Sequence, residues 1–381
     1  MLDLTVLCKV VDNYGDIGFV FRLCRSLSEL APDIKLRLVV SNLGSFAAMA
    51  DGINPALPFQ TFRGWQIFDW NNAEVCTAEF AQNPPVFLLE CFQCGRPEWL
   101  ENIIFAPGFD KTVQSLDVEY LTAEDWAEEF HLIKSGTRSI NVKKHIFMPG
   151  FTPKTGGFLL DNSFMQSRAS AEAALKKLDG TGVCISKEDF NIIVFSYPRN
   201  FDFLVSALNR FSKAFGKTRK VKVFIASGIC TEPFLDACQK CDAAFEVEKL
   251  PYLEQEKWDA LLTLADFSFV RGEDSFSRAC LCGKPFVWHI YKQEKDYHLV
   301  KLEAFHKKLG AASAGSDISD YEKFSMLYND GTESSTELEE LALKLFESYA
   351  QLEAPFKKLA DNLVSIGNMA QHLLEFLSSL I

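Results

Sequence analysis

One segment with residue types suited to group transfer, VVDNYGDIG at residues 10–18, overlaps the end of an apolar run at Leu4–Val11. It places two carboxylates, Asp12 and Asp16, four residues apart at the end of an expected buried strand. A carboxylate in such a position can polarise an acceptor group or remove its proton. For Asp16 alone, a structural role as the cap of a helix beginning at Ile17 explains the residue equally well.

The remaining residues of this segment are not those that a helix cap requires. Gly15 and Gly18 can let another backbone or a phosphate approach closely. Asn13 and Tyr14 serve no purpose in a cap. The glycine spacing is not G-x-G-x-x-G, so the dinucleotide-binding fingerprint is absent. The segment as a whole therefore favours a binding or catalytic site over a purely structural turn.

A second segment, FVRGEDSFSR at residues 269–278, also joins an expected strand to an expected helix. Backbone N–H groups at a helix start, the Arg271 guanidinium and the Ser275 hydroxyl together suit a diphosphate. Glu273 and Asp274 would repel phosphate, so we expect them to accept hydrogen bonds from sugar hydroxyls. The structural alternative is a capped helix with an internal Arg–Glu pair.

Aromatic residues precede this second segment. Phe195 and Tyr197 follow the first expected strand of the second half, and Tyr252 and Trp258 lie on either side of Gln255. Aromatic faces in loops suit a nucleobase, and stacking contributes about 1–3 kcal/mol per base. Core packing is an equally good explanation for each residue taken alone, because the chain contains 34 phenylalanines.

The composition excludes several classes of protein. With 381 residues, 48% hydrophobic and 24% charged, the chain has the size of two domains and the composition of a globular protein. Its net charge of −12 argues against a nucleic-acid partner, which would require a basic face. No apolar run approaches the ~18 residues of a membrane helix, and the amino terminus does not resemble a signal peptide. We expect neither nucleic acid nor membrane as a partner.

The cysteines favour a reducing compartment. There are eleven, an odd number, and they are scattered through expected strands and helices. This pattern is more typical of reduced thiols than of a disulfide framework, so we expect a cytoplasmic protein. The pairs Cys91/Cys94 and Cys238/Cys241 are too far apart for a zinc ribbon, and we interpret them as incidental.

Apolar runs of strand length alternate with helical patterns twice along the chain, which predicts an α/β fold with two parallel sheets. In the first half the expected strands are Leu4–Val11, Leu36–Val40, Val86–Leu89, Ile103–Ala106 and His145–Met148. In the second half they are Ile192–Ser196, Val221–Ala226, Phe245–Leu250, Phe267–Val270 and Pro285–Ile290.

We therefore expect two doubly wound, Rossmann-like domains at residues 1–183 and 184–358. The last fifty or so residues are helical in pattern, with a kink or a break expected at Pro355. The final helix, about residues 359–381, is long enough to pack back on the first domain. Ligands of open α/β sheets bind at the carboxyl ends of the strands, where both segments described above are expected.

Four segments together resemble the signature segments of the EarP family, the protein-arginine rhamnosyltransferases that modify elongation factor P. They are residues 10–18, 147–157, 270–278 and 283–293. The resemblance implies a bacterial enzyme of GT-B type, in which two Rossmann-like domains face each other across a cleft. It also implies dTDP-β-L-rhamnose as the donor, bound mainly by the second domain. The implied acceptor is the folded amino-terminal domain of elongation factor P, held by the first domain.

The resemblance also assigns roles to residues. Asp12 and Asp16 match two essential aspartates, with Asp16 as the general base, and Glu273 matches an essential glutamate. The donor-binding residues expected from the motifs and the resemblance are Asn13, Tyr14, Gly15, Phe195, Tyr197, Tyr252, Gln255, Trp258, Arg271, Glu273, Asp274 and Ser275. Three positions depart from the family pattern. Tyr252 and Trp258 stand where phenylalanine or another aromatic is expected, and Asp117 stands where asparagine is usual.

The implied reaction is an inverting transfer of L-rhamnose to an arginine side chain. A guanidinium with a pKa of about 12.5–13.8 is a poor nucleophile, so a carboxylate must remove its proton as the bond forms. The chain has no Asp-x-Asp motif, Asp117-x-Glu119 being the nearest approach, and we expect neither a metal nor a cofactor. Two alternatives are another GT-B nucleotide-sugar transferase and a non-catalytic module that binds a nucleotide-sugar or a translation factor.

Overall fold

The computed structural model describes residues 2–11, 15–215, 218–333 and 335–380, which form two compact units. The first unit comprises Met1–Asp161 and Ile366–Ile381, and the second comprises Asn162–Ser365. This division differs from the expected boundary at residues 183/184. The reason is that two helices before residue 183, α6 (Asn162–Ala169) and α7 (Ala171–Lys177), pack against α10 (Gln255–Leu264) of the second unit.

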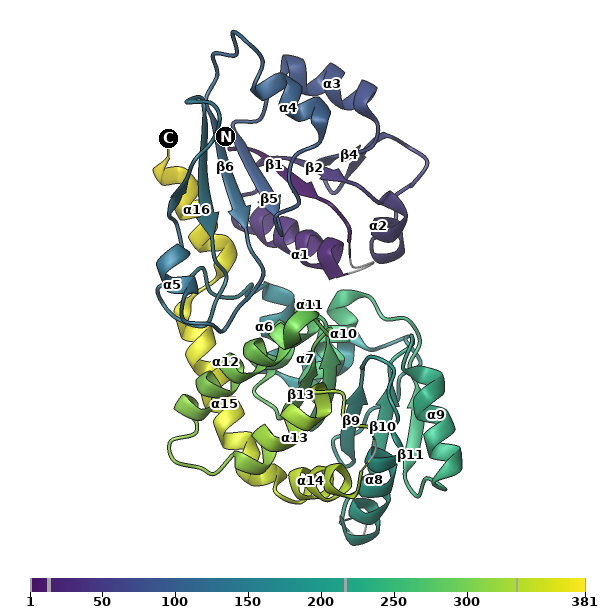
Figure 1. Ribbon diagram of the computed structural model, residues 1–381. Helices are drawn as coiled ribbons and strands as arrows, with labels where there is room; N and C mark the ends of the chain where they lie inside the picture. The colour runs from purple at the N-terminus through teal and green to yellow at the C-terminus, as the bar shows by residue number, and fades with distance from the viewer. Residues whose placement is uncertain (1, 12–14, 216–217, 334, 381) are drawn as a thin grey trace. The chain divides into compact units, whose positions relative to one another are not determined.

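The first unit contains an eight-stranded sheet in the order β3-β4-β2-β1-β5-β6-β8-β7 (Figure 1). Its strands are parallel except at the two edges, where β3 pairs antiparallel with β4 and β7 with β8. The strands are β1 (Asp3–Cys8), β2 (Lys35–Val40), β3 (Phe59–Phe62), β4 (Trp65–Asp69), β5 (Phe87–Cys91), β6 (Val113–Val118), β7 (Lys134–Ser135) and β8 (Val142–Phe147). The helices are α1 (Gly15–Leu30), α2 (Leu43–Met49), α3 (Ala73–Gln82), α4 (Glu98–Ile104), α5 (Ala127–Phe130) and α16 (Met369–Ser379).

Alternate residues of the central strands in this sheet pack against two different helical layers, because successive side chains of a strand point to opposite faces. Leu4 and Val6 of β1 pack with α1 and α16, whereas Leu7 packs with α3 and α4. The carboxyl-terminal helix α16 contributes Leu373 and Leu377 to the first of these cores. The last residues of the chain are therefore part of the first unit.

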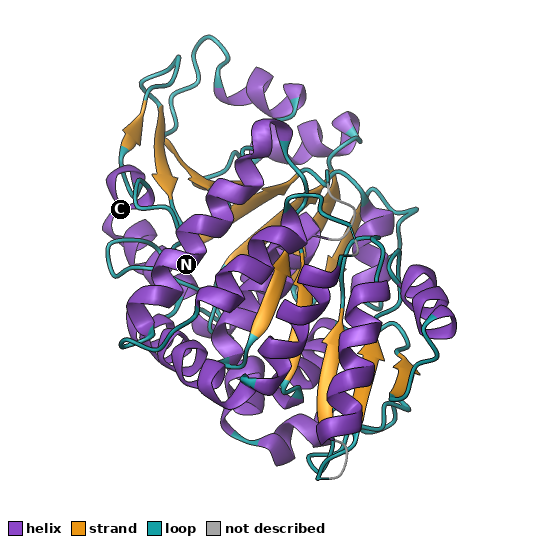
Figure 2. Cartoon of the chain, turned by 60° about the horizontal axis from the view of Figure 1, so that its bottom comes forward, coloured by secondary structure: helices purple, strands orange, loops and turns teal. Residues whose placement is uncertain are grey.

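The second unit contains a five-stranded, wholly parallel sheet in the order β11-β10-β9-β12-β13, with helices on both faces (Figure 2). Its strands are β9 (Phe190–Val194), β10 (Val221–Ile225), β11 (Glu246–Lys249), β12 (Phe267–Arg271) and β13 (Phe286–His289). Its other helices are α8 (Asp202–Phe215), α9 (Thr231–Lys240), α11 (Glu273–Cys282), η1 (Glu294–Asp296), α12 (Tyr297–Ala312), α13 (Ser319–Asn329), α14 (Thr336–Glu347) and α15 (Tyr349–Ile366).

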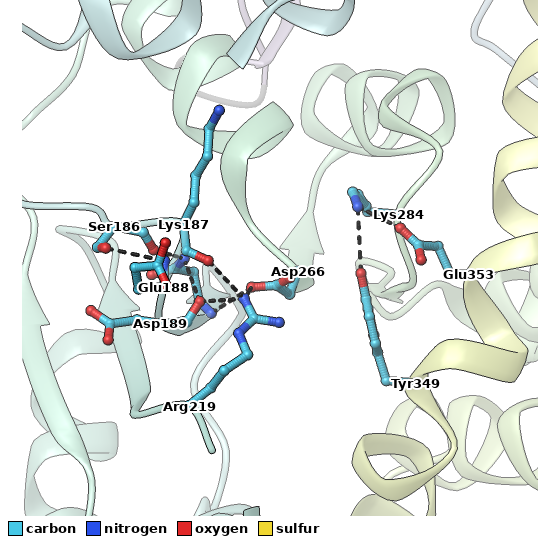
Figure 3. Close-up of polar contacts among 10 residues, drawn as sticks. Ser186, Lys187, Glu188, Asp189, Arg219, Asp266, Lys284, Tyr349 and Glu353 are labelled. Carbon is cyan, nitrogen blue, oxygen red and sulfur yellow. Dashed lines mark hydrogen bonds and ion pairs between the residues drawn. The ribbon is translucent and has the colours of Figure 1, made fainter. Parts of the chain in front are cut away.

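Polar contacts tie together the amino ends of the strands in this second sheet (Figure 3). Arg219 donates to the backbone carbonyls of Lys187 and Asp189 and to the carboxylate of Asp266, 3.0 Å away. Burial raises the pKa of the Asp266 carboxyl, against the lowering effect of the Asn191 N–H and of Arg219. Ligands of parallel sheets bind at the opposite, carboxyl edge, so this cluster stabilises the sheet without contributing to a site.

One strand expected from the sequence is wrong. The apolar run Ile103–Ala106 is not a strand, since it begins inside α4 and ends in the turn that follows. Of the kink or break expected at Pro355, the break is absent, because α15 runs through this residue and its buried face continues from Leu352 through Phe356 to Leu359. The chain instead leaves helical structure at Gly367, whose φ of +106° favours glycine.

Candidate functional site

Asp16 lies in the first turn of α1, the first helix after β1 along the chain. Its side chain is only 4% exposed, and its Oδ2 accepts a hydrogen bond of 2.7 Å from the backbone N–H of Val11. The amino end of a helix stabilises a negative charge, which suits an ionised carboxylate here. The other residues proposed from this segment are only partly described: α1 begins at Gly15, whereas Asp12, Asn13 and Tyr14 lie outside the described residues.

Tyr120 is a neighbour of Asp16 that the sequence did not reveal. Its hydroxyl lies 3.4 Å from Asp16 Oδ1, and its ring stacks on Phe92 at a centroid distance of 4.2 Å. Phe92 has a φ of +61°, which is uncommon for a residue with a side chain. The two residues follow β5 and β6, so only the pairing of these strands brings them together at the carboxyl edge.

In the second unit, Arg271 is the last residue of β12 and lies between aromatic rings. Its guanidinium carbon is 4.8 Å from the centroid of Phe195 and 4.9 Å from that of Tyr197. Trp258 packs edge-on against Phe195 at 5.2 Å. The structure thus brings four of the proposed donor-binding residues together. Aromatic faces hold the guanidinium in place, and its N–H groups suit a phosphate.

The helix α11 begins directly after Arg271. Its N-cap, Gly272, has a φ of +69° and provides no side-chain cap hydrogen bond. The amino end of a helix favours an anion. Ser275 is buried in this turn. Glu273 Oε1 lies 3.8 Å from the Nζ of Lys301 on α12, a partner that the sequence did not indicate.

The remaining proposed residues lie around the start of α10 and α11. Gln255 is buried at the first position of α10, while Tyr252, three residues earlier, is 57% exposed. Asp274 is half-buried in the first turn of α11 beside Ser275. Phe195 and Tyr197 are the aromatic residues that this structure places against the Arg271 guanidinium.

A second polar arrangement at this edge was also missed. His289, the last residue of β13, has its Nδ1 2.6 Å from the Ser196 hydroxyl oxygen and 3.2 Å from the Tyr197 nitrogen. The Ser196 oxygen is 2.9 Å from the Tyr328 hydroxyl. No single segment of sequence contains these residues, and the only local signal was that Ser196 and His289 lie near the ends of the apolar runs Ile192–Ser196 and Pro285–Ile290.

The acidic residues at the carboxyl end of β6, Asp117 inside the strand and Glu119 just after it, are engaged by neighbouring side chains. Asp117 is 2.7 Å from Lys144 Nζ, and Glu119 accepts bonds of 2.9 and 3.1 Å from the Gln93 amide. Burial raises the pKa of the Glu119 carboxyl, and the Gln93 hydrogen bond opposes this rise. Within the described ranges, no three His, Cys, Asp or Glu residues come together as a metal site, and the cysteines are free thiols.

None of the helices in the described part of the chain is long and apolar enough to cross a membrane.

Comparison with known proteins identifies relatives over most of the chain. A sequence model of the EarP family, described as elongation factor P (EF-P) rhamnosyltransferases, matches residues 4–378. A protein-arginine rhamnosyltransferase of Shewanella oneidensis is 32% identical, and the aligned region covers 87% of this chain and 86% of the relative. The corresponding protein of Pseudomonas putida is 33% identical, with 79% of each chain covered.

Solved structures share the fold at low identity. One concerns EarP-mediated arginine glycosylation of translation elongation factor EF-P, and it superposes with a TM-score of 0.61 at 20% identity over 100% of both chains. A UDP-GlcNAc 2-epimerase from Neisseria meningitidis bound to UDP-GlcNAc superposes with a TM-score of 0.52 at 12% identity over 100% of both chains. These similarities show a GT-B type of fold. The chain belongs to the EarP family, and it is a protein-arginine rhamnosyltransferase.

Proposed function

We propose that this transferase moves L-rhamnose from dTDP-β-L-rhamnose to an arginine of translation elongation factor P, with inversion at the anomeric carbon. The observation that carries the proposal is the match to the EarP family over residues 4–378. The structure that superposes over the full length of both chains concerns arginine glycosylation of EF-P. Both observations support EF-P as the acceptor, and the family resemblance is the basis for the donor.

The acceptor arginine is proposed to bind beside Asp16 in the first unit. Asp12 would hold and polarise the guanidinium, and Asp16 would accept its proton as the new bond to the sugar forms. The buried position of Asp16 supports this role, because a buried carboxylate interacts strongly with a nearby positive charge. The Tyr120 hydroxyl, 3.4 Å away, would keep the Asp16 carboxylate oriented.

The donor is proposed to bind at the carboxyl edge of the second sheet. Arg271 and the amino end of α11 would hold the diphosphate and stabilise the charge that develops on the leaving dTDP. The aromatic group of Phe195, Tyr197 and Trp258 supports this placement, because it fixes the Arg271 side chain. Glu273 and Asp274 would accept hydrogen bonds from sugar hydroxyls.

The test is turnover with purified components. Incubation with folded EF-P and dTDP-β-L-rhamnose should add the mass of one deoxyhexose residue, and fragmentation should locate it on a single arginine. EF-P with that arginine replaced by lysine is the matched control and should stay unmodified. Formation of a complex without a mass change would identify a binding module. Modification of EF-P only with a different nucleotide-sugar would contradict the proposed donor.

A further inference from the structure

The imidazole of His289 occupies a defined place beside Arg271. The two residues end β13 and β12 and are partners in register. Because β12 lies between β9 and β13, the 2.6 Å contact between Ser196 Oγ and His289 Nδ1 spans the strand that carries Arg271. Tyr197 packs edge-on against the His289 ring at 5.2 Å and also contacts Arg271. His289 and Arg271 therefore share one aromatic neighbour at the carboxyl edge.

The hydrogen bonds of His289 determine which ring nitrogen carries the proton. The backbone N–H of Tyr197 lies 3.2 Å from Nδ1 and can only donate, so Nδ1 must be an acceptor. Tyr328, Ser196 and His289 then form a chain in which each hydroxyl donates to the next group and Ser196 donates to Nδ1. The proton of the neutral ring is consequently on Nε2, since the bond made by one nitrogen sets the state of the other.

The surroundings also keep this ring neutral. Burial, together with the positive charges of Arg199 and Arg271, lowers the pKa of His289 to about 3. A neutral ring whose Nδ1 accepts presents a single N–H donor at Nε2. Among the described residues, no protein group is hydrogen-bonded to Nε2, so this donor remains for a ligand.

We propose that His289 is a donor-binding residue of the transferase, and that its Nε2–H donates a hydrogen bond to the diphosphate of the nucleotide-sugar. The inference rests on the proposed donor site at Arg271. Arg271 supplies the positive charge for the diphosphate. His289 supplies a directed N–H that adds no charge, and Ser196 and Tyr197 hold its orientation. Backbone N–H groups at the start of a helix bind anions in the same way, as directed donors that carry no net charge.

Two substitutions of His289 distinguish the role of Nδ1 from the role of Nε2. In His289→Asn the side-chain amide lies near the position of Nδ1, so an acceptor for Tyr197 remains and the distal donor is lost. In His289→Gln the longer amide reaches the position of Nε2 and can replace that donor. The loss of one hydrogen bond to a charged group should weaken dTDP binding to His289→Asn by about 10- to 100-fold. The His289→Gln variant should stay within a few-fold of wild type.

Calorimetric titration of the full chain with dTDP and with thymidine tests the proposal. Both variants should bind thymidine as wild type does, because thymidine has no phosphate. Unchanged dTDP affinity in His289→Asn would overturn the inference, and so would an equal loss for dTDP and thymidine. Wild-type protein that does not bind dTDP, or Arg271→Ala protein with undiminished affinity, would contradict the proposed donor site and remove the basis of the inference with it.

A measurement on the wild-type protein does not depend on the folding of a variant. In protein labelled with nitrogen-15 histidine, the His289 resonances should show the Nε2-protonated tautomer before ligand is added. Addition of dTDP should shift the Nε2–H signal, whereas thymidine should leave it in place. A His289 ring protonated on Nδ1, or an Nε2–H signal that dTDP does not move, would overturn the proposal.

Discussion

Asp16 makes a hydrogen bond within the first unit, and its carboxylate is buried, which is uncommon for a charged group. Its Oδ2 accepts from the Val11 N–H, and the side chain is nearly fully buried at the start of α1. Asp16 is the second residue of α1 and accepts from a residue that precedes the helix, so the bond is not the N-cap bond expected from the sequence. A substitution that keeps an oxygen acceptor for the Val11 N–H and removes the negative charge separates this structural role from catalysis, because asparagine retains a side-chain carbonyl.

We predict that Asp16→Asn lowers the transfer rate by about 10²- to 10⁴-fold, the usual effect of losing a general base. Binding of dTDP should be unchanged, because Asp16 belongs to the first unit and the proposed donor site to the second. Single-turnover assays and calorimetry measure the two quantities. Tyr120→Phe is the matched control for positioning and should lower the rate far less. A normal rate in Asp16→Asn would leave Asp16 with a structural role only.

At the scale of elements, the segment at residues 147–157 has a structural explanation. A Cβ atom on Gly156 would lie 2.3 Å from the ring of Phe147, the last residue of β8. The backbone N–H of Gly156 donates to the Met148 carbonyl at 2.7 Å. Gly157, with a φ of +74°, carries the chain past His372 of α16. The glycines let the loop fold tightly over the end of β8, so this segment of the family signature supports the first unit.

We predict that Gly156→Ala lowers the free energy of unfolding by about 1–3 kcal/mol, the usual cost of forcing extra atoms into a packed site. The clash is with a buried ring rather than the end of a flexible side chain. Gly136→Ala is the control, because a Cβ at Gly136 meets nothing within 4 Å. Thermal or urea denaturation of the two variants measures the difference. Equal stability would show that the loop adapts without cost.

For the whole molecule, buried neutral histidines link stability to pH. Burial lowers the pKa of His306 to about 4, and burial with two nearby arginines lowers that of His289 to about 3. In the unfolded chain both rings take up protons near pH 6.5, whereas in the folded protein they stay neutral until the pH approaches these lower values. Between those limits the unfolded state binds more protons, so the free energy of unfolding falls as the pH falls.

The expected result is a loss of about 1.4 kcal/mol per pH unit for each of these histidines between pH 6 and pH 4.5. Both residues belong to the second unit, so its unfolding transition should show the larger part of this effect. Denaturation curves at several pH values measure the slope. His306→Gln cannot titrate and should flatten the curve by the contribution of one histidine. A slope that this variant leaves unchanged would mean that His306 is not neutral in the folded protein.

The α/β class and the position of most strands and helices follow from the residue pattern alone. Apolar runs of strand length coincide with buried strands, and the strand expected at Val221–Ala226 is β10, Val221–Ile225. The strand β6 was missed because its sequence, VQSLDV, contains three polar residues, and all of them are buried. Lys144, the partner of Asp117, lies on the neighbouring strand β8. The residue pattern within one segment carries no information on contacts between different strands.

The sequence likewise identified Asp16 and Arg271, because each stands in a short motif between a strand and a helix. Which residues surround them depends on how the whole chain folds. Tyr120 meets Asp16 because β6 lies beside β5, and β5 lies beside β1. His289 meets Ser196 because β13, β12 and β9 are neighbours, although 93 residues separate the two in sequence. Strand order is set by which faces can be buried together, and that is a property of the whole chain rather than of any segment.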